Sequence, residues 1–519
     1  MRSTVLSNAM LAVTPTASSF AIVLANELAT RRLATDVASI LKPGDLVTLS
    51  GDLGAGKTAF ARALIRHLAA DDTLDVPSPT FTLVQTYALE RFTVVHADLY
   101  RVAHTAELAE LGVDEAAENA VVLLEWPDRA GDVLPADRLD ITLTLTAQGG
   151  PNQRHVELTG HGGFTARLER LAAIRHFLAE EGLSDAQRSH IQGDASSRAY
   201  ERVTHKEHKF VLMNAPRRPD GPPVRGGLPY SAIAHLAEDV KPFVAMARAL
   251  RERGLSAPQV HAANLADGLL LLEDLGREGV VAGDPPAPIE ERYAAAVDVL
   301  AQLHRESVPD TLSVTPGVDH HLPAYDIDAF LIEAELLLDW YVPYRGGALS
   351  GVARSEFTAL WRDALSPAYD APQTWVMRDY HSPNLMWLPE REGVARVGLL
   401  DFQDVVMGPA PYDLVSLLQD ARVDVPDPME IALLGRYVKA RLNADSDFPT
   451  TPFVQLYVTL GAQRATKILG IFARLDRRDG KPQYLRHLPR VWRYLRRSLI
   501  HPAMNDLKAW YDAHVPLPP

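Results

Sequence analysis

The feature that most constrains the fold of this chain is a glycine-rich segment at residues 51–58, which matches the pattern G-x-x-x-x-G-K-[ST]. An apolar run at Leu46–Ser50 predicts a strand before it, and Ala59–Leu68 has the periodicity of a helix after it. Residues 20–145 continue this alternation of strands and helices, which indicates a mainly parallel, three-layer α/β sheet. The segment consists of Gly51, Asp52, Leu53, Gly54, Ala55, Gly56, Lys57 and Thr58.

The chemistry of such a loop explains its spacing. Its glycines let backbone N–H groups wrap phosphates, and the following helix N-terminus adds positive potential. We expect Lys57 to reach the β- and γ-phosphates of ATP, and Thr58 to coordinate Mg²⁺. Asp98 follows the short strand Val94–His96, where a magnesium-associated carboxylate belongs. Glu125 follows Val121–Leu124 and is a candidate for polarising the attacking water or holding the metal.

Length and charge limit the remaining possibilities. A chain of 519 residues predicts two or three domains. The absence of cysteine excludes disulfides and thiolate sites, and a net charge of −14 argues against a protein that grips nucleic acid unaided. No apolar run is long enough for a membrane span or a secretory leader, so we expect a cytoplasmic protein that starts at Met1 or Met10.

Turn-forming residues divide the chain. The strands predicted at Leu139–Leu145 and His155–Thr159 alternate polar and apolar residues, as in an antiparallel pair, and glycines follow them up to Gly163. A small β-containing region and a longer helical region come next, interrupted by one hairpin at Leu385–Leu400. We therefore predict an extension, a P-loop domain and a two-lobed, α+β protein-kinase-like domain. Their bounds are 1–19, 20–163 and 164–519, with lobes at 164–276 and 277–519.

The N-terminal region resembles the TsaE family of ATPases, which serve the threonylcarbamoyladenosine modification of tRNA. Besides residues 51–58, the resemblance rests on the ordered blocks 78–82, 96–101, 107–112 and 125–126. It implies that Thr80 belongs to a switch-like loop, that Asp98 binds magnesium and that Glu125 is catalytic, with Trp126 at the nucleotide site. It also implies partners, namely the transferase and scaffold subunits of the modification complex, which would carry the tRNA.

A second chemical motif lies at Arg378-Asp379, followed five residues later by Asn384. This is the kinase catalytic-loop spacing, in which the aspartate accepts the substrate hydroxyl proton and the asparagine binds magnesium. Asp401 ends an apolar strand and begins Asp-Phe, the place of the second magnesium ligand of kinases. A chance Asp-x₄-Asn pair is common, but the downstream strand and Asp-Phe favour a phosphotransferase.

These segments resemble the aminoglycoside phosphotransferase-like kinases, and among them the anomeric kinases of N-acetylmuramate and N-acetylglucosamine from peptidoglycan recycling. The resemblance covers about residues 165–505. It implies a phosphate-covering turn formed by Gly193, Asp194, Ser196 and Ser197, which would otherwise be interpreted as an ordinary hairpin turn. Glu273 ends the strand that would be the inter-lobe hinge, whose backbone bonds adenine. The usual phosphate-gripping strand lysine is replaced by Met213.

The sugar pocket is less well marked. Glu335, Trp340 and His381 are candidate substrate contacts, although an amphipathic helix that packs its aromatics explains the first two equally well. The predicted function is an ATPase for tRNA modification fused to an ATP- and magnesium-dependent sugar kinase. The second domain alternatively phosphorylates an amino alcohol or aminoglycoside, or binds nucleotide without catalysis. The sequence does not decide whether the two halves communicate.

Overall fold

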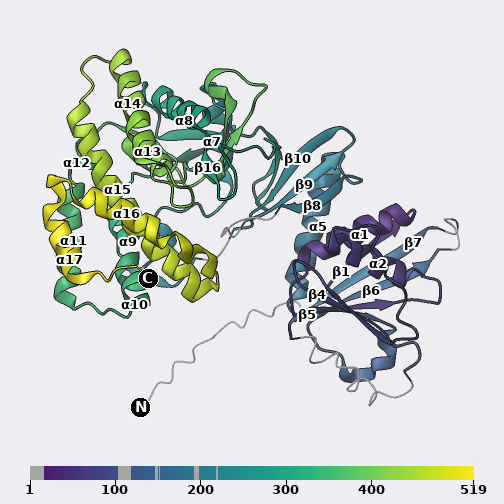
Figure 1. Cartoon of the computed structure of the whole chain (residues 1–519). Helices are drawn as coiled ribbons and strands as arrows, with labels where there is room; N and C mark the ends of the chain where they lie inside the picture. Colours follow the sequence, from purple (N-terminus) through teal and green to yellow (C-terminus); the bar gives the residue numbers. More distant parts are fainter. Residues whose placement is uncertain are drawn as a thin grey trace, which may run out of the picture. The chain divides into compact units, whose positions relative to one another are not determined.

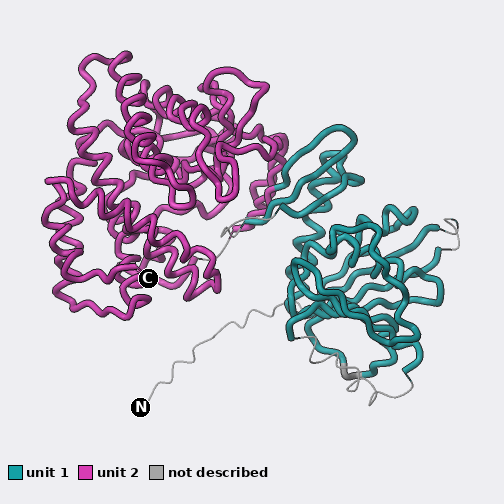
Figure 2. Tube along the Cα trace, in the orientation of Figure 1, with its two compact units in different colours: residues 1–212 teal, residues 213–519 magenta. Residues whose placement is uncertain are grey.

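The computed structural model describes residues 17–102, 118–146, 150, 152–191, 198–217 and 220–518. The chain forms two compact units, residues 1–212 and 213–519, each considered by itself below (Figure 2). The division predicted at residues 163/164 stays a prediction. The block at 107–112 and the turn at 193–197 lie outside the described residues.

A seven-stranded sheet forms the core of the first unit (Figure 1). Its strand order is β1-β7-β6-β2-β5-β4-β3. The four central strands β6, β2, β5 and β4 pair in parallel, whereas β1, β7 and β3 pair antiparallel with their neighbours. The predicted mainly parallel sheet is confirmed, and it has antiparallel strands at its edges. The bounds are β1 Ala17–Leu24, β2 Leu46–Ser50, β3 Val84–Ala88, β4 Thr93–Asp98, β5 Ala120–Glu125, β6 Arg138–Leu145 and β7 Arg154–His161.

Both faces of this sheet are covered. Successive residues of a strand point to opposite faces, and accordingly Val121 and Leu123 belong to one buried cluster while Val122 and Leu124 belong to another. The first cluster packs against the helices, and the second includes Ala130 from a short 3₁₀ segment. The helical segments of this region are α1 Glu27–Ile40, α2 Lys57–Ala69, η1 Pro127–Val133 and α5 Phe164–Glu180.

A five-stranded sheet follows in the chain, with the order β13-β14-β10-β9-β8. The division between the two units falls within β10. Its strands are β8 Gln187–Ile191, β9 Ala199–His205, β10 His208–Asn214, β13 Val260–Asn264 and β14 Leu269–Glu273. A small antiparallel pair, β11 Pro223–Arg225 and β12 Leu228–Pro229, follows β10 in the chain.

The second unit is mostly helical, with more strand pairs than the single predicted hairpin (Figure 1). Besides β20–β21 it contains β15–β16, β17–β18 and β19–β22, which are short and were missed because runs of two to five residues give little periodicity. Its strands are β15 Val281–Ala282, β16 Ala287–Pro288, β17 Thr311–Thr315, β18 Val318–His321, β19 Gln373–Val376, β20 Leu385–Trp387, β21 Val397–Leu399 and β22 Val406–Pro409.

The long helix α15 (Thr450–Asp479) runs through the second unit and packs against α13, α16 and η2. Seventeen of its residues are buried, so it forms the spine of the helical region. The other helical segments are α6 Tyr230–Ile233, α7 Lys241–Glu252, α8 Glu290–Leu303, α9 Ile327–Ala334, η2 Leu337–Tyr341, α10 Val342–Tyr344, α11 Gly351–Leu365, α12 Pro367–Asp370, η3 Ser382–Asn384, η4 Gly393–Arg396, α13 Pro411–Leu418, α14 Asp427–Ala444, η5 Pro482–His487, α16 Leu488–Leu499, η6 Pro502–Met504 and α17 Asn505–His514.

Candidate active sites

The glycine-rich segment connects β2 to α2 with a backbone that only glycine accepts easily. Gly51 has φ 138°, and a Cβ built there would lie 2.2 Å from the carbonyl oxygen of Leu143. Gly56 has φ 109° and occupies the N-cap of α2. The Nε of Arg154, from β7, donates to the carbonyl of Ala55 at 2.8 Å and fixes the loop from the opposite side. The backbone N–H groups at the start of α2, which have no partner within the helix, thus face a loop whose backbone conformation is fixed.

Lys57 is the first residue of α2 and is 5% exposed. Its Nζ donates to the carbonyl oxygens of Gly51 at 2.7 Å and Asp52 at 3.0 Å, and lies 3.7 Å from the ring centroid of Trp126. Burial lowers the pKa of Lys57, against the opposing attraction of nearby carboxylates. The ammonium group is therefore held inside the loop, where phosphate oxygens would compete with these carbonyls.

The predicted acidic pair comes together because of the sheet register. Asp98 and Glu125 are Cα partners at the carboxyl ends of the parallel strands β4 and β5. The Thr58 hydroxyl donates to Glu125 Oε2 at 3.1 Å. The Thr80 hydroxyl donates to Asp98 Oδ2 at 2.8 Å, and Ser78 does so at 3.2 Å. The predicted switch residue with Asp98, and the threonine of the loop with Glu125, thus form two hydrogen-bonded sets side by side at the ends of the paired strands.

A cavity of about 260 Å³ opens beside this group. Its walls include Lys57, Thr58, Asp98, Glu125 and Trp126. Carboxylate and hydroxyl oxygens are the ligands that Mg²⁺ prefers, and a lysine with glycine N–H groups suits phosphate, so the side chains present fit both predicted cofactors. Further lining residues are Leu53, Gly54, Gly56, Ala59, Ser78, Thr80 and Tyr100.

His96 contributes to this site and was not singled out from the sequence. It lies fully buried in β4, and its Nε2 is 2.9 Å from Glu125 Oε1. Its Nδ1 has no hydrogen-bond partner among the described residues. The sequence shows only a histidine within an apolar strand, which is more often a structural residue; the contact becomes visible once β4 and β5 are paired.

The second site is built on the loop between β19 and η3, residues 377–381. The backbone N–H groups of Met377 and Arg378 donate to the two carboxylate oxygens of Asp413 at 2.7 and 2.9 Å. Asp413 therefore braces the loop from inside α13, whose N-cap is Ala410. Burial raises the pKa of Asp413 to about 7, despite these two hydrogen bonds.

The predicted base, Asp379, follows a residue in the left-handed region, Arg378 at φ 65°. Asn384 Nδ2 donates to the Asp379 carbonyl at 2.9 Å, so the two predicted site residues are tied within one loop. Burial alone would raise the pKa of Asp379, but the nearby basic side chains of His381, Lys467, Arg464 and Arg378 lower it below its usual value. The carboxylate is therefore kept ionised and able to accept a proton.

The hairpin β20–β21 places Asp401 beside this loop. Leu385 pairs with Leu399, and the Leu400 N–H donates to the Asn384 carbonyl at 2.9 Å, so Asn384 and Asp401 flank the open end of the hairpin. Asp401 has φ 57°, and its Oδ1 accepts from Gln403 Nε2 at 2.7 Å. Two oxygen-bearing side chains that lie 17 positions apart in sequence are thus neighbours, which fits a magnesium ligand pair.

His381 is engaged inside the loop. Arg422 Nη1 lies 2.5 Å from His381 Nε2, and because a guanidinium can only donate, Nε2 accepts. The protonated Nδ1 then donates to the Asp379 carbonyl at 2.8 Å. Burial lowers the pKa of His381, which agrees with a neutral ring. Asp420 accepts from the backbone N–H of Ser382 at 3.0 Å and from its hydroxyl at 2.5 Å, which holds the next residue of the turn.

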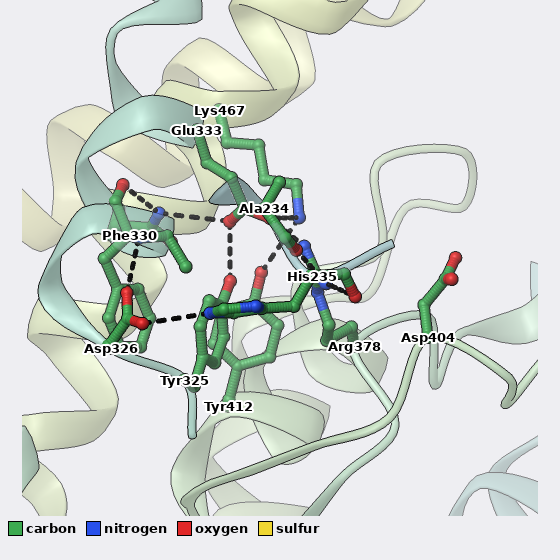
Figure 3. Close-up of polar contacts among 12 residues, drawn as sticks. Ala234, His235, Tyr325, Asp326, Phe330, Glu333, Arg378, Asp404, Tyr412 and Lys467 are labelled. Carbon is green, nitrogen blue, oxygen red and sulfur yellow. Dashed lines mark hydrogen bonds and ion pairs between the residues drawn. The ribbon is translucent and has the colours of Figure 1, made fainter. Parts of the chain in front are cut away.

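A buried charge network lies behind Arg378 (Figure 3). The fully buried carboxylate of Glu333, on α9, forms ion pairs with Arg378 and with Lys467 of α15, the latter at 2.8 Å. It also accepts from the Tyr325 hydroxyl at 2.5 Å. Lys467 Nζ additionally lies 3.5 Å from the Tyr412 hydroxyl. These residues come from segments far apart in sequence, and their connection was not predictable without the tertiary fold.

The remaining predicted contacts have structural partners. Glu335 forms an ion pair with Arg225, and burial raises its pKa. Trp340 is half-buried within the π-helical turn η2. The Glu273 carboxylate forms ion pairs with Arg251 and Arg391. Gly193, Ser196 and Ser197 lie outside the described residues. Met213, where kinases carry a lysine, is buried.

No helix within the described residues is long and apolar enough to cross a membrane. Residues 24–156 match the family model of the threonylcarbamoyl adenosine biosynthesis protein TsaE, and residues 188–456 match that of the phosphotransferase enzyme family.

Individual relatives agree with these models. An N-acetylmuramate/N-acetylglucosamine kinase of Caulobacter vibrioides is 41% identical over 366 residues, which cover 68% of this chain and 99% of the relative. A Pseudomonas aeruginosa protein of the same name is 34% identical, covering 60% and 84%. A TsaE protein of Rickettsia felis is 43% identical over 124 residues, 24% of this chain and 72% of the relative. The chain therefore joins two families, belonging to the TsaE family in its N-terminal part and to the phosphotransferase enzyme family in the remainder.

Proposed function

We propose that the N-terminal part hydrolyses ATP in support of the threonylcarbamoyladenosine modification of tRNA. The register of β4 and β5 carries this proposal, because it unites Asp98 and Glu125 beside Lys57 and Thr58. Thr58 and Asp98 would hold Mg²⁺, which neutralises phosphate charge when bound. Glu125 would accept a proton as the oxygen of water bonds to the γ-phosphorus and the bond to the β-phosphate oxygen breaks.

The acidic chain, with its net charge of −14, suits a component that meets tRNA through partner subunits rather than directly. The proposed partners are the transferase and the scaffold subunit of the modification complex. We place this work in the cytoplasm, where these partners and ATP would be found.

The second part is proposed to phosphorylate the anomeric hydroxyl of N-acetylmuramate or N-acetylglucosamine. The observation that supports it is the connection of Asp379, Asn384 and the β20–β21 hairpin end. Asp379 would accept the proton of the sugar hydroxyl while the oxygen of that hydroxyl bonds to the γ-phosphorus. The bond from the γ-phosphorus to the β-phosphate oxygen breaks, and ADP departs. Asn384 and Asp401 would hold Mg²⁺, and Asp413 keeps the loop in place through two backbone hydrogen bonds.

The test is phosphorus NMR of the full chain with magnesium-ATP and each sugar, comparing wild type with Asp379→Asn and Lys57→Ala. We expect a sugar-1-phosphate signal that is lost in Asp379→Asn and kept in Lys57→Ala, because the two sites are chemically separate. Phosphate release without sugar should fall instead in Lys57→Ala. A wild-type protein that forms neither sugar phosphate would reject the sugar assignment, and an amino alcohol and aminoglycoside panel would then be assayed.

A further inference from the structure

Arg464 is a buried cation with no assigned role. It lies on α15 and is 6% exposed. Its neighbours Arg378 and Lys467 are also largely buried, and both form ion pairs with Glu333. Within the part of the chain that the structure describes, no hydrogen bond or ion pair joins the Arg464 guanidinium to another residue. Arg464 therefore differs from the other two cations in having no direct counter-charge.

An unpaired buried guanidinium lowers the stability of a fold, because it loses water without gaining a counter-charge. The nearby carboxylates remove only part of this cost. Asp379 and Asp413 attract the guanidinium, but neither forms an ion pair or hydrogen bond with it. The Glu333 carboxylate is shared by Arg378 and Lys467. A charge left uncompensated in this way is typical of a ligand site, where the missing counter-charge arrives with the ligand.

The guanidinium lies within electrostatic range of the predicted catalytic loop. It acts, together with His381 and Lys467, against the effect of burial on the pKa of Asp379, and it attracts the carboxylate of Asp413 in the same sense. Arg464 and Lys467 are three positions apart on α15, so they project from the same side of the helix. The side of α15 that faces the loop is therefore positively charged.

We propose that Arg464 binds an anionic oxygen of the substrates at the Asp379 site. This inference rests on the proposed sugar kinase activity. Two sources of such an oxygen are present in that reaction: the carboxylate of N-acetylmuramate, which N-acetylglucosamine lacks, and the phosphoryl group that is transferred to either sugar. A guanidinium suits both, because its N–H groups match carboxylate and phosphate geometry.

The experiment uses the full chain with Arg464→Met and Arg464→Lys, and with Arg478→Met as the control. Arg478 lies on the same helix but is exposed and paired with Asp479. For each variant, kcat and KM are measured with both sugars over a range of pH, together with the melting temperature. The Arg464→Met variant should lose at least 10-fold in kcat/KM while its melting temperature stays equal or rises, because an uncompensated charge has been removed.

The two sugars identify the source of the anion. A rise in KM confined to N-acetylmuramate would assign Arg464 to the carboxylate, and an equal fall in kcat for both sugars would assign it to the phosphoryl group. In both cases Arg464→Lys should recover part of the loss, and Arg478→Met should behave as wild type.

Three results would overturn the inference. The first is unchanged kinetics with both sugars. The second is a loss that disappears at alkaline pH, which would mean that Arg464 acts through the ionisation of Asp379. The third is a lower melting temperature in both Arg464 variants that accounts for the lost activity. A wild-type protein inactive on both sugars would instead reject the proposed function, so the two failures are distinguishable.

Discussion

Single buried residues hold the carboxylates that we propose to be catalytic, or the residues next to them. Glu125 is fixed from two sides, by the Thr58 hydroxyl on Oε2 and by His96 on Oε1. Asp379 follows Arg378, whose own position is set by Glu333 and by the Ala234 carbonyl at 2.7 Å. In each case the neighbour holds a charged group that would otherwise rotate, which limits the geometries that the site can adopt.

Replacing His96 with alanine should slow ATP hydrolysis by about 10–100-fold, the typical cost of losing an outer partner of a site carboxylate. ATP affinity should change little, since His96 does not line the cavity. Steady-state phosphate release and nucleotide titration measure the two quantities. The exposed His155 on β7 provides the matched control. Equal hydrolysis rates in His96→Ala and His155→Ala would show that Glu125 needs no such support.

Asp413 should make stability depend on pH. Its folded pKa, about 7, is higher than its usual 3.8, so the folded state favours the neutral acid. The wild type should therefore lose stability as pH rises from about 4 to 7, by roughly 3–4 kcal/mol for a shift of this size. Asp413→Asn, which resembles the neutral form, should lack this component. Urea unfolding of both proteins between pH 4 and 8 measures the difference, and parallel pH profiles would contradict it.

At the scale of secondary structure, the site residues are brought together because they lie at the ends of paired strands. β4 and β5 run parallel and deliver Asp98 and Glu125 to one edge, and the β20–β21 hairpin brings Asn384 and Asp401 together at its open end. The glycine loop adds a constraint of its own, since the Cβ of any other residue at position 51 would overlap the Leu143 carbonyl of β6.

Gly51→Ala should therefore abolish ATP binding by forcing the loop away from β6, with a loss of affinity of at least about 100-fold and a lower melting temperature. Gly435→Ala is the matched control, because Gly435 lies in α14 with open space around its Cα. That substitution should leave stability equal or slightly higher. Binding of a fluorescent ATP analogue distinguishes them, and tight binding by the Gly51→Ala protein would show that the loop adapts.

Local patterns predicted the elements that hold the sites. The strands predicted at 46–50 and 121–124 and the helix predicted at 59–68 followed from periodicity and a phosphate-loop motif, which depend on near neighbours in sequence, and the structure has β2, β5 and α2 there. The ion pairs of Glu333 with Arg378 and Lys467 were beyond such reasoning, because these partners lie 45 and 134 residues away. The antiparallel pairing of β1 with β7 and of β3 with β4 likewise depends on contacts that periodicity does not encode.

At the scale of the whole molecule, a buried ion network joins the TsaE-like part to the beginning of the phosphotransferase part. Asp36 of α1 is 4% exposed and forms ion pairs with Arg175 of α5 and Arg188 of β8. Arg188 also donates to Glu201 of β9, at 2.6 and 3.0 Å. All four residues lie within the first compact unit, so the first two strands of the five-stranded sheet are fastened to a helix of the neighbouring fold.

Asp36→Asn should loosen this connection, because it leaves Arg175 without its buried counter-charge and Arg188 with Glu201 alone. Breaking a buried pair costs about 3–5 kcal/mol. Hydrogen exchange should accelerate in residues 187–205, and the melting temperature should fall. Glu27→Gln serves as the control, since Glu27 lies on the same helix but is exposed, and its ion pair with Arg31 is also at the surface. Unchanged exchange in Asp36→Asn would show that the strands hold themselves in place.

The pairing of β1 with β7 has a consequence for how such a protein can arise. Ala17 lies opposite His161, so the chain enters and leaves the seven-stranded sheet at the same corner. A module with adjacent ends can be gained or lost by a single genetic joining event, without threading the rest of the polypeptide through it. The seven-stranded sheet can therefore be joined to another fold as a complete unit, with the Asp36 network as a contact across the junction.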